Sequence, residues 1–174
     1  LLDIAYAPAA TLWRINHGWR KRQEVGYRLD LKRGIWLGQQ ETSGKTTGGA
    51  PGEVKSQVRL FVRGTANALL AYPRAGAVLN SPSFLPSLQY ALARGIEELF
   101  EVEESELASE RIGEGDHFGI LFYEGAEGGL GVLRRLAQEP SALAAVARKA
   151  LELLHFDPVT GEDKRPGDDE NGCS

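Results

Sequence analysis

Hydrophobic and polar residues alternate in the first third of the chain, and this alternation predicts β-strands. Tyr27, Leu29 and Leu31 are apolar, whereas Arg28 and Asp30 between them are charged. A repeat of two residues is typical of a strand that buries one face and exposes the other. The strands expected here are Thr11–Asn16, Gly26–Leu31 and, after a hairpin turn at Lys32–Gly34, Ile35–Leu37.

A polar segment follows these strands. Gly38–Glu53 holds five glycines together with many Ser and Thr residues. Such a composition buries too little apolar surface to offset the entropy lost when the chain is ordered. We expect a long loop here rather than a tight turn.

Helical periodicity begins in the second half of the chain. Leu88, Leu92, Ile96 and Leu99 recur at the spacing of one helix face, and Pro86 suits the first turn of that helix. Apolar runs predict the remaining elements. These are strands at Val58–Val62, Ala66–Tyr72, Glu106–Ile112 and Phe118–Tyr123, a helix ending near Gln138, and a helix from Pro140 to about Leu154.

Together these elements predict an α+β fold, with a mixed, largely antiparallel sheet and about three helices packed on it. With 42% hydrophobic residues, the chain can bury the core that such a fold needs. The segment Asp157–Ser174 is rich in Gly, Asp and Glu, which predicts disorder. We therefore expect one α+β domain over residues 1–156 and a polar tail over residues 157–174.

Composition narrows the setting of the protein. The formal net charge of −4 gives no overall attraction to nucleic acid, so a contact with DNA must come from a local patch. No apolar run approaches the ~20 residues that cross a bilayer, and no signal peptide opens the chain. The chain has no Met and one Cys, so we expect a part of a longer protein, without internal disulfides, in the reducing cytoplasm.

Basic residues interleaved with aromatic ones form the best candidate for a nucleic-acid contact. Positive side chains neutralise phosphates, and aromatic rings stack on unpaired bases. The alternative is a solvated hairpin whose rings turn into the core. The group comprises Arg14, His17, Arg20, Lys21, Arg22, Arg28, Lys32 and Arg33, with Trp13, Trp19, Tyr27 and Trp36 between them, and Arg59, Arg63 and Arg74 as further candidates.

The loop sequence Thr42-Ser-Gly-Lys-Thr-Thr47 resembles part of a phosphate-binding loop. That motif needs its first glycine at position 39, where this chain has Gln39. It also needs a helix after Thr46, where the chain continues Thr-Gly-Gly-Ala-Pro. We therefore expect a solvated loop, and a nucleotide-dependent hydrolase using Lys45 and Glu124 stays an alternative function.

Three glycines, Gly128, Gly129 and Gly131, lie where a buried strand passes into a helix. Such a turn can bind an anion, or it can bring helix and sheet close together because glycine has no Cβ. The acidic Glu124 and Glu127 argue against a phosphate, so we favour the structural interpretation. Catalysis by the two carboxylates is not favoured, because no His or Cys lies near them in sequence.

The chain contains few groups that could bind a metal. His17, His117 and His155 are scattered without the spacing of metal ligands. Cys173 is the single cysteine, and a structural zinc site needs four ligands. From the residues alone, Cys173 could only be one member of a larger set.

Four segments, Leu2–Trp19, Thr65–Leu70, Ser87–Glu97 and Phe122–Gly131, carry a resemblance to a known family. They resemble the C-terminal zinc-binding domain of Mrf-type bacterial superfamily-two DEAD/DEAH-box helicases, and the likeness covers most of residues 2–156. The last two segments are the most specific, because a buried strand, an acidic residue and Gly-Gly-x-Gly before a helix occur together.

The resemblance implies a domain that follows two RecA-like ATPase lobes and ends in a four-cysteine zinc site. Cys173 would be the first zinc ligand, but the other three cysteines and the ATPase motifs are absent from this sequence. We therefore expect zinc in the parent protein and none in these residues alone. A related domain occurs in the helicase-partner subunit of the DISARM phage-defence system.

On this basis we expect a non-catalytic accessory domain of an ATP-dependent 3′–5′ DNA helicase, which grips or positions DNA in repair or phage defence. The expected partners are single-stranded or forked DNA and helicase motor domains, in the same chain or in another subunit, and no membrane. A domain that only docks on a helicase subunit is an alternative. The expected DNA contacts are Arg14, Trp19, Arg20, Lys21, Arg22, Arg28 and Arg33, while Glu124, Gly128, Gly129 and Gly131 lock helix to sheet.

Overall fold

The computed structural model describes residues 2–18, 26–37, 54–74, 82–113, 118–125 and 128–164. The chain divides into two units. Leu1–Ala10 and Thr65–Ser174 make up one, which we call the main unit, and Thr11–Gly64 make up the other, which we call the inserted unit. Strands β1 (Leu2–Asn16) and β5 (Leu60–Pro73) each contribute residues to both units.

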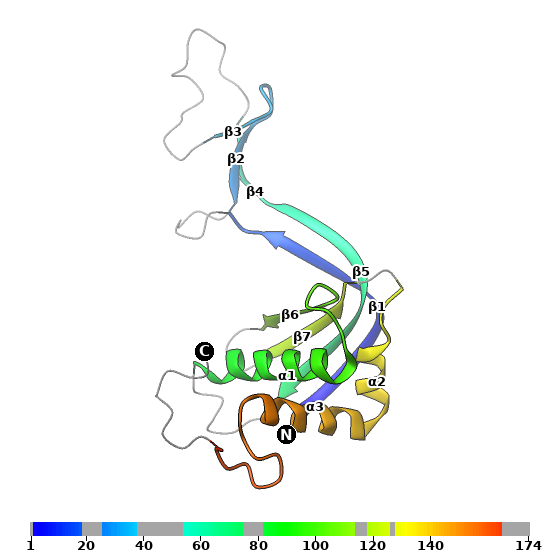
Figure 1. The fold of residues 1–174 in the computed structure, drawn as a ribbon. Coiled ribbons are helices and arrows are strands. Elements are labelled where there is room, and N and C mark those ends of the chain that lie inside the picture. The colour runs from blue at the N-terminus through cyan, green and yellow to red at the C-terminus, as the bar shows by residue number, and fades with distance from the viewer. Residues whose placement is uncertain are drawn as a thin grey trace. The chain divides into compact units, whose positions relative to one another are not determined.

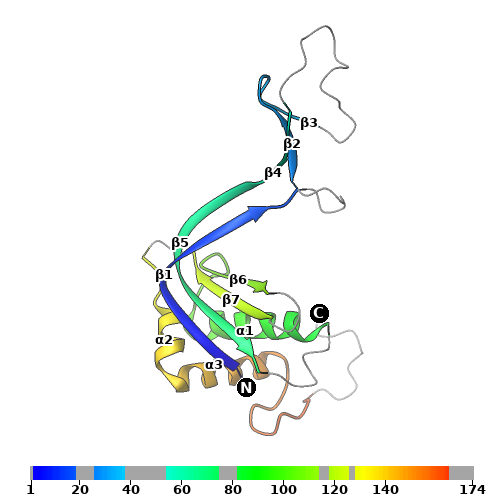
Figure 2. The same cartoon turned by 180° about the vertical axis from the view of Figure 1, so that it is seen from behind.

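The main unit combines a four-stranded sheet with three helices. The strand order is β1-β5-β7-β6, and β7 (Gly119–Glu124) pairs antiparallel with β5 and with β6 (Leu107–Ile112). The helices are α1 (Phe84–Phe100), α2 (Val132–Gln138) and α3 (Pro140–Leu153). Helices α1 and α3 lie in front of the sheet in Figure 1 and behind it in Figure 2, so both cover the same face.

The core of the main unit lies between the sheet and the helices. Leu69 of β5 lies opposite Phe122 of β7, Ala71 lies opposite Ile120, and all four side chains are buried. Their spacing of two residues follows the pleat of the strands. The helices add Leu92, Ile96, Leu133, Leu136 and Val146 to the same core. Burying one Leu, Ile or Phe side chain stabilises the fold by about 1.5–3 kcal/mol.

Gly95 allows α1 and α3 to approach each other closely. A Cβ atom at Gly95 would lie 2.8 Å from the carbonyl oxygen of Val146 and 3.3 Å from the Cβ of Ala150. Helix α3 accordingly packs chiefly against α1. The apolar stripe predicted for α1 is correct for Leu92 and Ile96, whereas Leu99 in the last turn is 39% exposed.

The inserted unit contains a second sheet that the sequence did not predict. Its order is β3-β2-β4, with β2 at Tyr27–Asp30, β3 at Ile35–Leu37 and β4 at Val54–Val58. Strand β2 pairs antiparallel with both neighbours. The predicted α+β class with three helices is confirmed, and the single sheet of the prediction is replaced by two antiparallel sheets.

Two strands are longer than predicted. Strand β5 continues through Gly64, so it includes the end of the strand expected at Val58–Val62 and all of the one expected at Ala66–Tyr72, whereas Val58 is the last residue of β4. Strand β1 begins at Leu2 rather than at Thr11. Leu2, Ile4 and Tyr6 pack against the core, and this alternation ends at the Ala- and Pro-rich residues 7–10.

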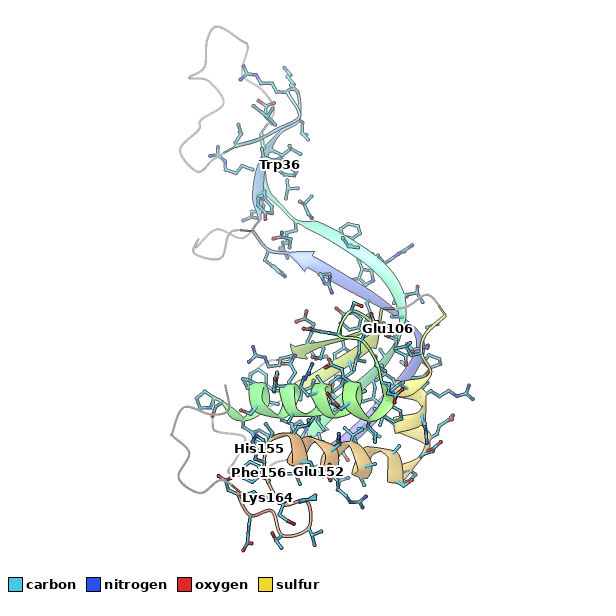
Figure 3. All side chains as sticks on the ribbon, in the orientation of Figure 1. Trp36, Glu106, Glu152, His155, Phe156 and Lys164 are labelled. Carbon is cyan, nitrogen blue, oxygen red and sulfur yellow. The ribbon has the colours of Figure 1, made fainter. Side chains whose placement is uncertain are left out.

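Residues 157–164, the described part of the tail in which disorder was predicted, form a hairpin, and residues 165–174 lie outside the described ranges. Phe156 and Asp163 form an isolated β-bridge. The carboxylate of Asp157 accepts hydrogen bonds from the N–H groups of Thr160 (2.9 Å) and Val159 (2.8 Å), and these bonds hold the pKa of Asp157 below its ordinary value. Lys164 Nζ lies 3.4 Å from the same carboxylate. Figure 3 labels Phe156 and Lys164 near the end of α3.

Candidate functional site

The predicted site residues fall into two places, the turn between β7 and α2 in the main unit and the inserted unit. Glu124, Gly128, Gly129 and Gly131 belong to the first place, and Arg14, Arg28 and Arg33 belong to the second. Some predicted residues lie outside the described ranges. These are Trp19, Arg20, Lys21, Arg22, Lys45, Glu127 and Cys173.

Glu124 ends β7 with a buried carboxylate that is 1% exposed. Its Oε1 accepts a hydrogen bond from the N–H of Leu133 at 3.0 Å, and its Oε2 accepts one from the N–H of Leu130 at 3.0 Å. The side-chain amide of Asn67 donates a third bond to Oε2 at 2.9 Å. An isolated buried carboxylate would strongly destabilise the fold, and these three donors compensate for the water that Glu124 has lost.

The carboxylate of Glu124 also satisfies the start of α2. The first N–H groups of a helix have no partner within the helix, and they carry partial positive charge. Leu133 lies in the first turn of α2, so Glu124 occupies the place that a bound anion would take. Helix α2 has seven residues, and the geometry of this turn is that of a structural joint between strand and helix.

Asn67 extends this joint to the rest of the sheet. It lies in β5, and its Oδ1 accepts a hydrogen bond from the N–H of Ala9 in β1 at 3.2 Å. Asn67 and Glu124 thus connect β1, β5, β7 and α2 through side-chain hydrogen bonds. Asn67 was not among the predicted site residues, although a polar amide between the apolar residues of a buried strand is a recognisable signal.

The three glycines of the turn have different surroundings. Gly128, Gly129 and Gly131 all have positive φ angles, of 87°, 73° and 77°. A Cβ at Gly128 or Gly131 would meet nothing within 4 Å. A Cβ at Gly129 would lie 2.5 Å from Oε2 of Glu124 and would overlap the amide nitrogen of Asn67. Only at Gly129 does the buried network require the missing Cβ as well as the backbone conformation.

Charge is segregated between the two units. The inserted unit has eleven Lys and Arg residues against four Asp and Glu residues, a formal net charge of +7. The main unit has nine against twenty, a formal net charge of −11. The mild net charge of the whole chain conceals this division. It was present in the sequence, but the boundaries of the units were needed to see it.

The described basic residues of the inserted unit lie on several elements. Arg14 lies in β1, the half-buried Arg28 lies in β2, and Arg33 lies in the turn before β3. Asp30 organises this turn, because its Oδ1 accepts hydrogen bonds from the N–H groups of Lys32 at 3.0 Å and Arg33 at 3.1 Å. Arg33 Nε lies 4.0 Å from the other carboxylate oxygen of Asp30, so part of its charge is balanced.

Aromatic rings lie exposed beside these charges. Trp13 of β1 is 53% exposed and Phe61 of β5 is 59% exposed, with ring centroids 5.0 Å apart. The guanidinium carbon of Arg63 lies 5.7 Å from the centroid of the Trp13 ring. Trp36, labelled in Figure 3, contacts Tyr27 edge to face and is also exposed. Trp13 and Trp36 therefore do not turn into a core, as the alternative interpretation of the hairpin required.

Arg74 does not belong to the basic group that the sequence analysis considered. It lies in the main unit, where its guanidinium donates hydrogen bonds to the carboxylate of Asp3 at 2.6–3.0 Å. These bonds hold the pKa of Asp3 below its ordinary value. Arg59 and Arg63 lie in the inserted unit and are exposed.

Comparison with known proteins found a family that is similar to the second half of the chain. Residues 88–173 match the family model described as the MrfA Zn-binding domain. This part of the chain is similar to that family. The MrfA Zn-binding domain match begins within α1 and lies entirely in the main unit. No curated protein and no solved structure matches the chain. No described helix is both long enough and apolar enough to cross a membrane.

The family description of the MrfA Zn-binding domain implies zinc. A structural zinc site uses four ligands, mostly thiolates and imidazoles. Across the described ranges, no three His, Cys, Asp or Glu residues come together where they could hold a metal ion. Cys173, the last residue of the family match and the single cysteine, lies outside those ranges.

Proposed function

We propose that this chain is a non-catalytic accessory part of an ATP-dependent DNA helicase in the cytoplasm, and that its inserted unit grips DNA. The observation that carries the proposal is the concentration of positive charge in the inserted unit, +7 against −11 in the main unit. Resemblance to Mrf-type helicases and the family match support a helicase as the setting, in DNA repair or in phage defence.

The chemistry of this surface suits a phosphate backbone. Lys32 and Arg59 are exposed, so they are available to neutralise phosphates. Each neutralised phosphate releases condensed counterions, so affinity falls steeply as salt is raised. We expect the main unit to have a structural role, because the hydrogen bonds of Glu124 and Asn67 join its strands to α2.

The test measures binding of the whole chain to labelled DNA that carries both a duplex and a single-stranded tail. Lys32→Glu together with Arg59→Glu should weaken binding. The slope of log affinity against log salt concentration should also become shallower, by an amount that corresponds to about two fewer phosphate contacts. Arg134→Glu together with Arg148→Glu is the matched control, because it changes net charge equally but lies in the main unit. The control variant should bind like the wild type.

Two results would overturn the proposal. The first is a wild-type chain without salt-dependent affinity for this DNA. The second is an equal loss of binding in the control variant, which would show that net charge alone governs the interaction. A chain that assembles with a helicase subunit and has no affinity for DNA would instead be a docking domain, and nucleotide turnover by the chain would identify a hydrolase.

A further inference from the structure

The inserted unit exposes an aromatic cluster that phosphate binding does not need. Trp13 and Phe61 lie on neighbouring strands and contact each other at 5.0 Å with their rings tilted by 40°. Both rings are more than half exposed, at 53% and 59%. Large exposed apolar side chains that cluster on one surface usually mark a binding site.

The charges around the cluster indicate what binds there. The Arg63 guanidinium lies 5.7 Å from the centroid of the Trp13 ring, so a cation lies beside two half-exposed rings. This combination is typical of proteins that hold unpaired nucleotides, in which rings stack on bases and cations contact the backbone. A protein partner that covered the aromatic cluster would also have to bury the charge of Arg63, within a unit whose net charge is +7.

Base stacking also separates single strands from duplexes. Within a duplex each base is covered by its neighbours, so its face is not available to a protein ring. An unpaired base can lie flat on an exposed ring, and such stacking is tolerant of sequence because every base has a π-face. A ring cluster therefore adds affinity only for the unpaired part of a nucleic acid.

We propose that Trp13, Phe61 and Arg63 form a stacking site for unpaired nucleobases, which makes the inserted unit prefer single strands to duplexes. This inference rests on the proposed function, because it assigns a strand preference to the same DNA-gripping unit. The shared chemistry is an unpaired base, which either single-stranded DNA or single-stranded RNA supplies.

The test compares the whole chain with Trp13→Leu and Phe61→Leu variants. Leucine keeps apolar bulk but removes the ring face. The probes are oligo-dT and oligo-U of about 12 nucleotides, within the site sizes of single-strand binders, and a DNA duplex of equal length. Val62→Ala is the matched control, because Val62 adjoins Phe61 on β5 and is 71% exposed without any ring.

Each leucine variant should bind the single strands about tenfold more weakly and the duplex unchanged, since one stacked base contributes about 1–3 kcal/mol. Val62→Ala should bind every probe like the wild type. Because both rings are exposed, the urea midpoint of each variant should stay at the wild-type value. A tenfold loss with oligo-dT alone would identify DNA as the source of the base, and an equal loss with oligo-U would include RNA.

Three results would overturn the stacking site. The first is a leucine variant that binds single strands like the wild type. The second is a leucine variant that loses duplex and single-strand binding equally. A change of oligomeric state in the leucine variants, with nucleic-acid binding intact, would identify the cluster as a protein contact. In all three cases the wild type still binds DNA, so the proposed function stands; a wild type that binds no probe refutes both.

Discussion

Substituting alanine at two adjacent glycines should separate backbone strain from the effect of the buried network. Gly128 and Gly129 both have positive φ angles, of 87° and 73°. A Cβ at Gly128 would meet open space, whereas a Cβ at Gly129 would collide with the groups that bond Asn67 to Glu124. We expect Gly129→Ala to destabilise the main unit much more than Gly128→Ala.

The magnitude follows from two contributions. An alanine in the left-handed region loses about 1–2 kcal/mol, and this loss is common to both variants. At Gly129 the added methyl also displaces the hydrogen bond from Asn67 to Glu124, and a hydrogen bond to a charged group contributes about 1.5–3 kcal/mol. The free energy of unfolding should therefore fall by about 1–2 kcal/mol for Gly128→Ala and by about 2.5–5 kcal/mol for Gly129→Ala.

Urea unfolding followed by circular dichroism measures this difference. With a slope of about 2 kcal/mol per M, the two unfolding midpoints should differ by roughly 1 M. Gly129→Val adds a branched side chain at the same place, and it should leave the main unit unfolded, because total stability is only about 5–15 kcal/mol.

A double-mutant cycle tests the cause as well as the size. Removing the amide with Asn67→Ala relieves the contact with Asn67 and leaves the contact with Oε2 of Glu124, so Gly129→Ala should be less destabilising in that background. Equal midpoints for Gly128→Ala and Gly129→Ala, or an unchanged effect of Gly129→Ala beside Asn67→Ala, would show that the turn adjusts freely and that the argument from the network is mistaken.

Two further predictions concern other parts of the main unit and its surroundings. Gly95→Val should lower the melting temperature by separating α1 from α3, since a Cβ at Gly95 would lie 2.8 Å from the carbonyl oxygen of Val146. The control is Gly64→Ala, which should leave the melting temperature unchanged because a Cβ at Gly64 would meet nothing within 4 Å. The hydrogen bonds of Asp157 lower its pKa in the folded protein. The Asp157 carboxylate should therefore stabilise the hairpin after α3 at any pH above the ordinary carboxyl pKa, and the hairpin should loosen only when the pH falls below that value. The amide shift of Thr160 against pH measures this, and an inflection at or above the ordinary value contradicts it.

The elements with strong periodicity were predictable, because local patterns determine them. The helix around Leu92 and Ile96 and the strand that ends at Glu124 follow directly from the spacing of apolar residues. The start of β1 was not predictable in this way, because its alternation stops at Ala7 and Pro8 before the predicted strand begins.

The contacts that build the two sites could not be predicted, because they join residues far apart in the chain. Asn67 and Glu124 are separated by 57 positions, and no local pattern selects that amide as the partner of that carboxylate. Trp13 and Phe61 meet only because β1 and β5 are neighbours in one sheet. The charge of the inserted unit became visible only once its boundaries were known.

The position of β5 in the middle of the sheet bears on how shorter versions of this protein should be designed. A fragment trimmed to the family match would start at Leu88, inside α1, and would lack both β1 and β5. Strand β7 would then become an open edge with an unpaired row of backbone groups, a template for aggregation. Truncations intended for expression or crystallisation should therefore keep residues 2–10 and 65–74, even though the family match does not include them.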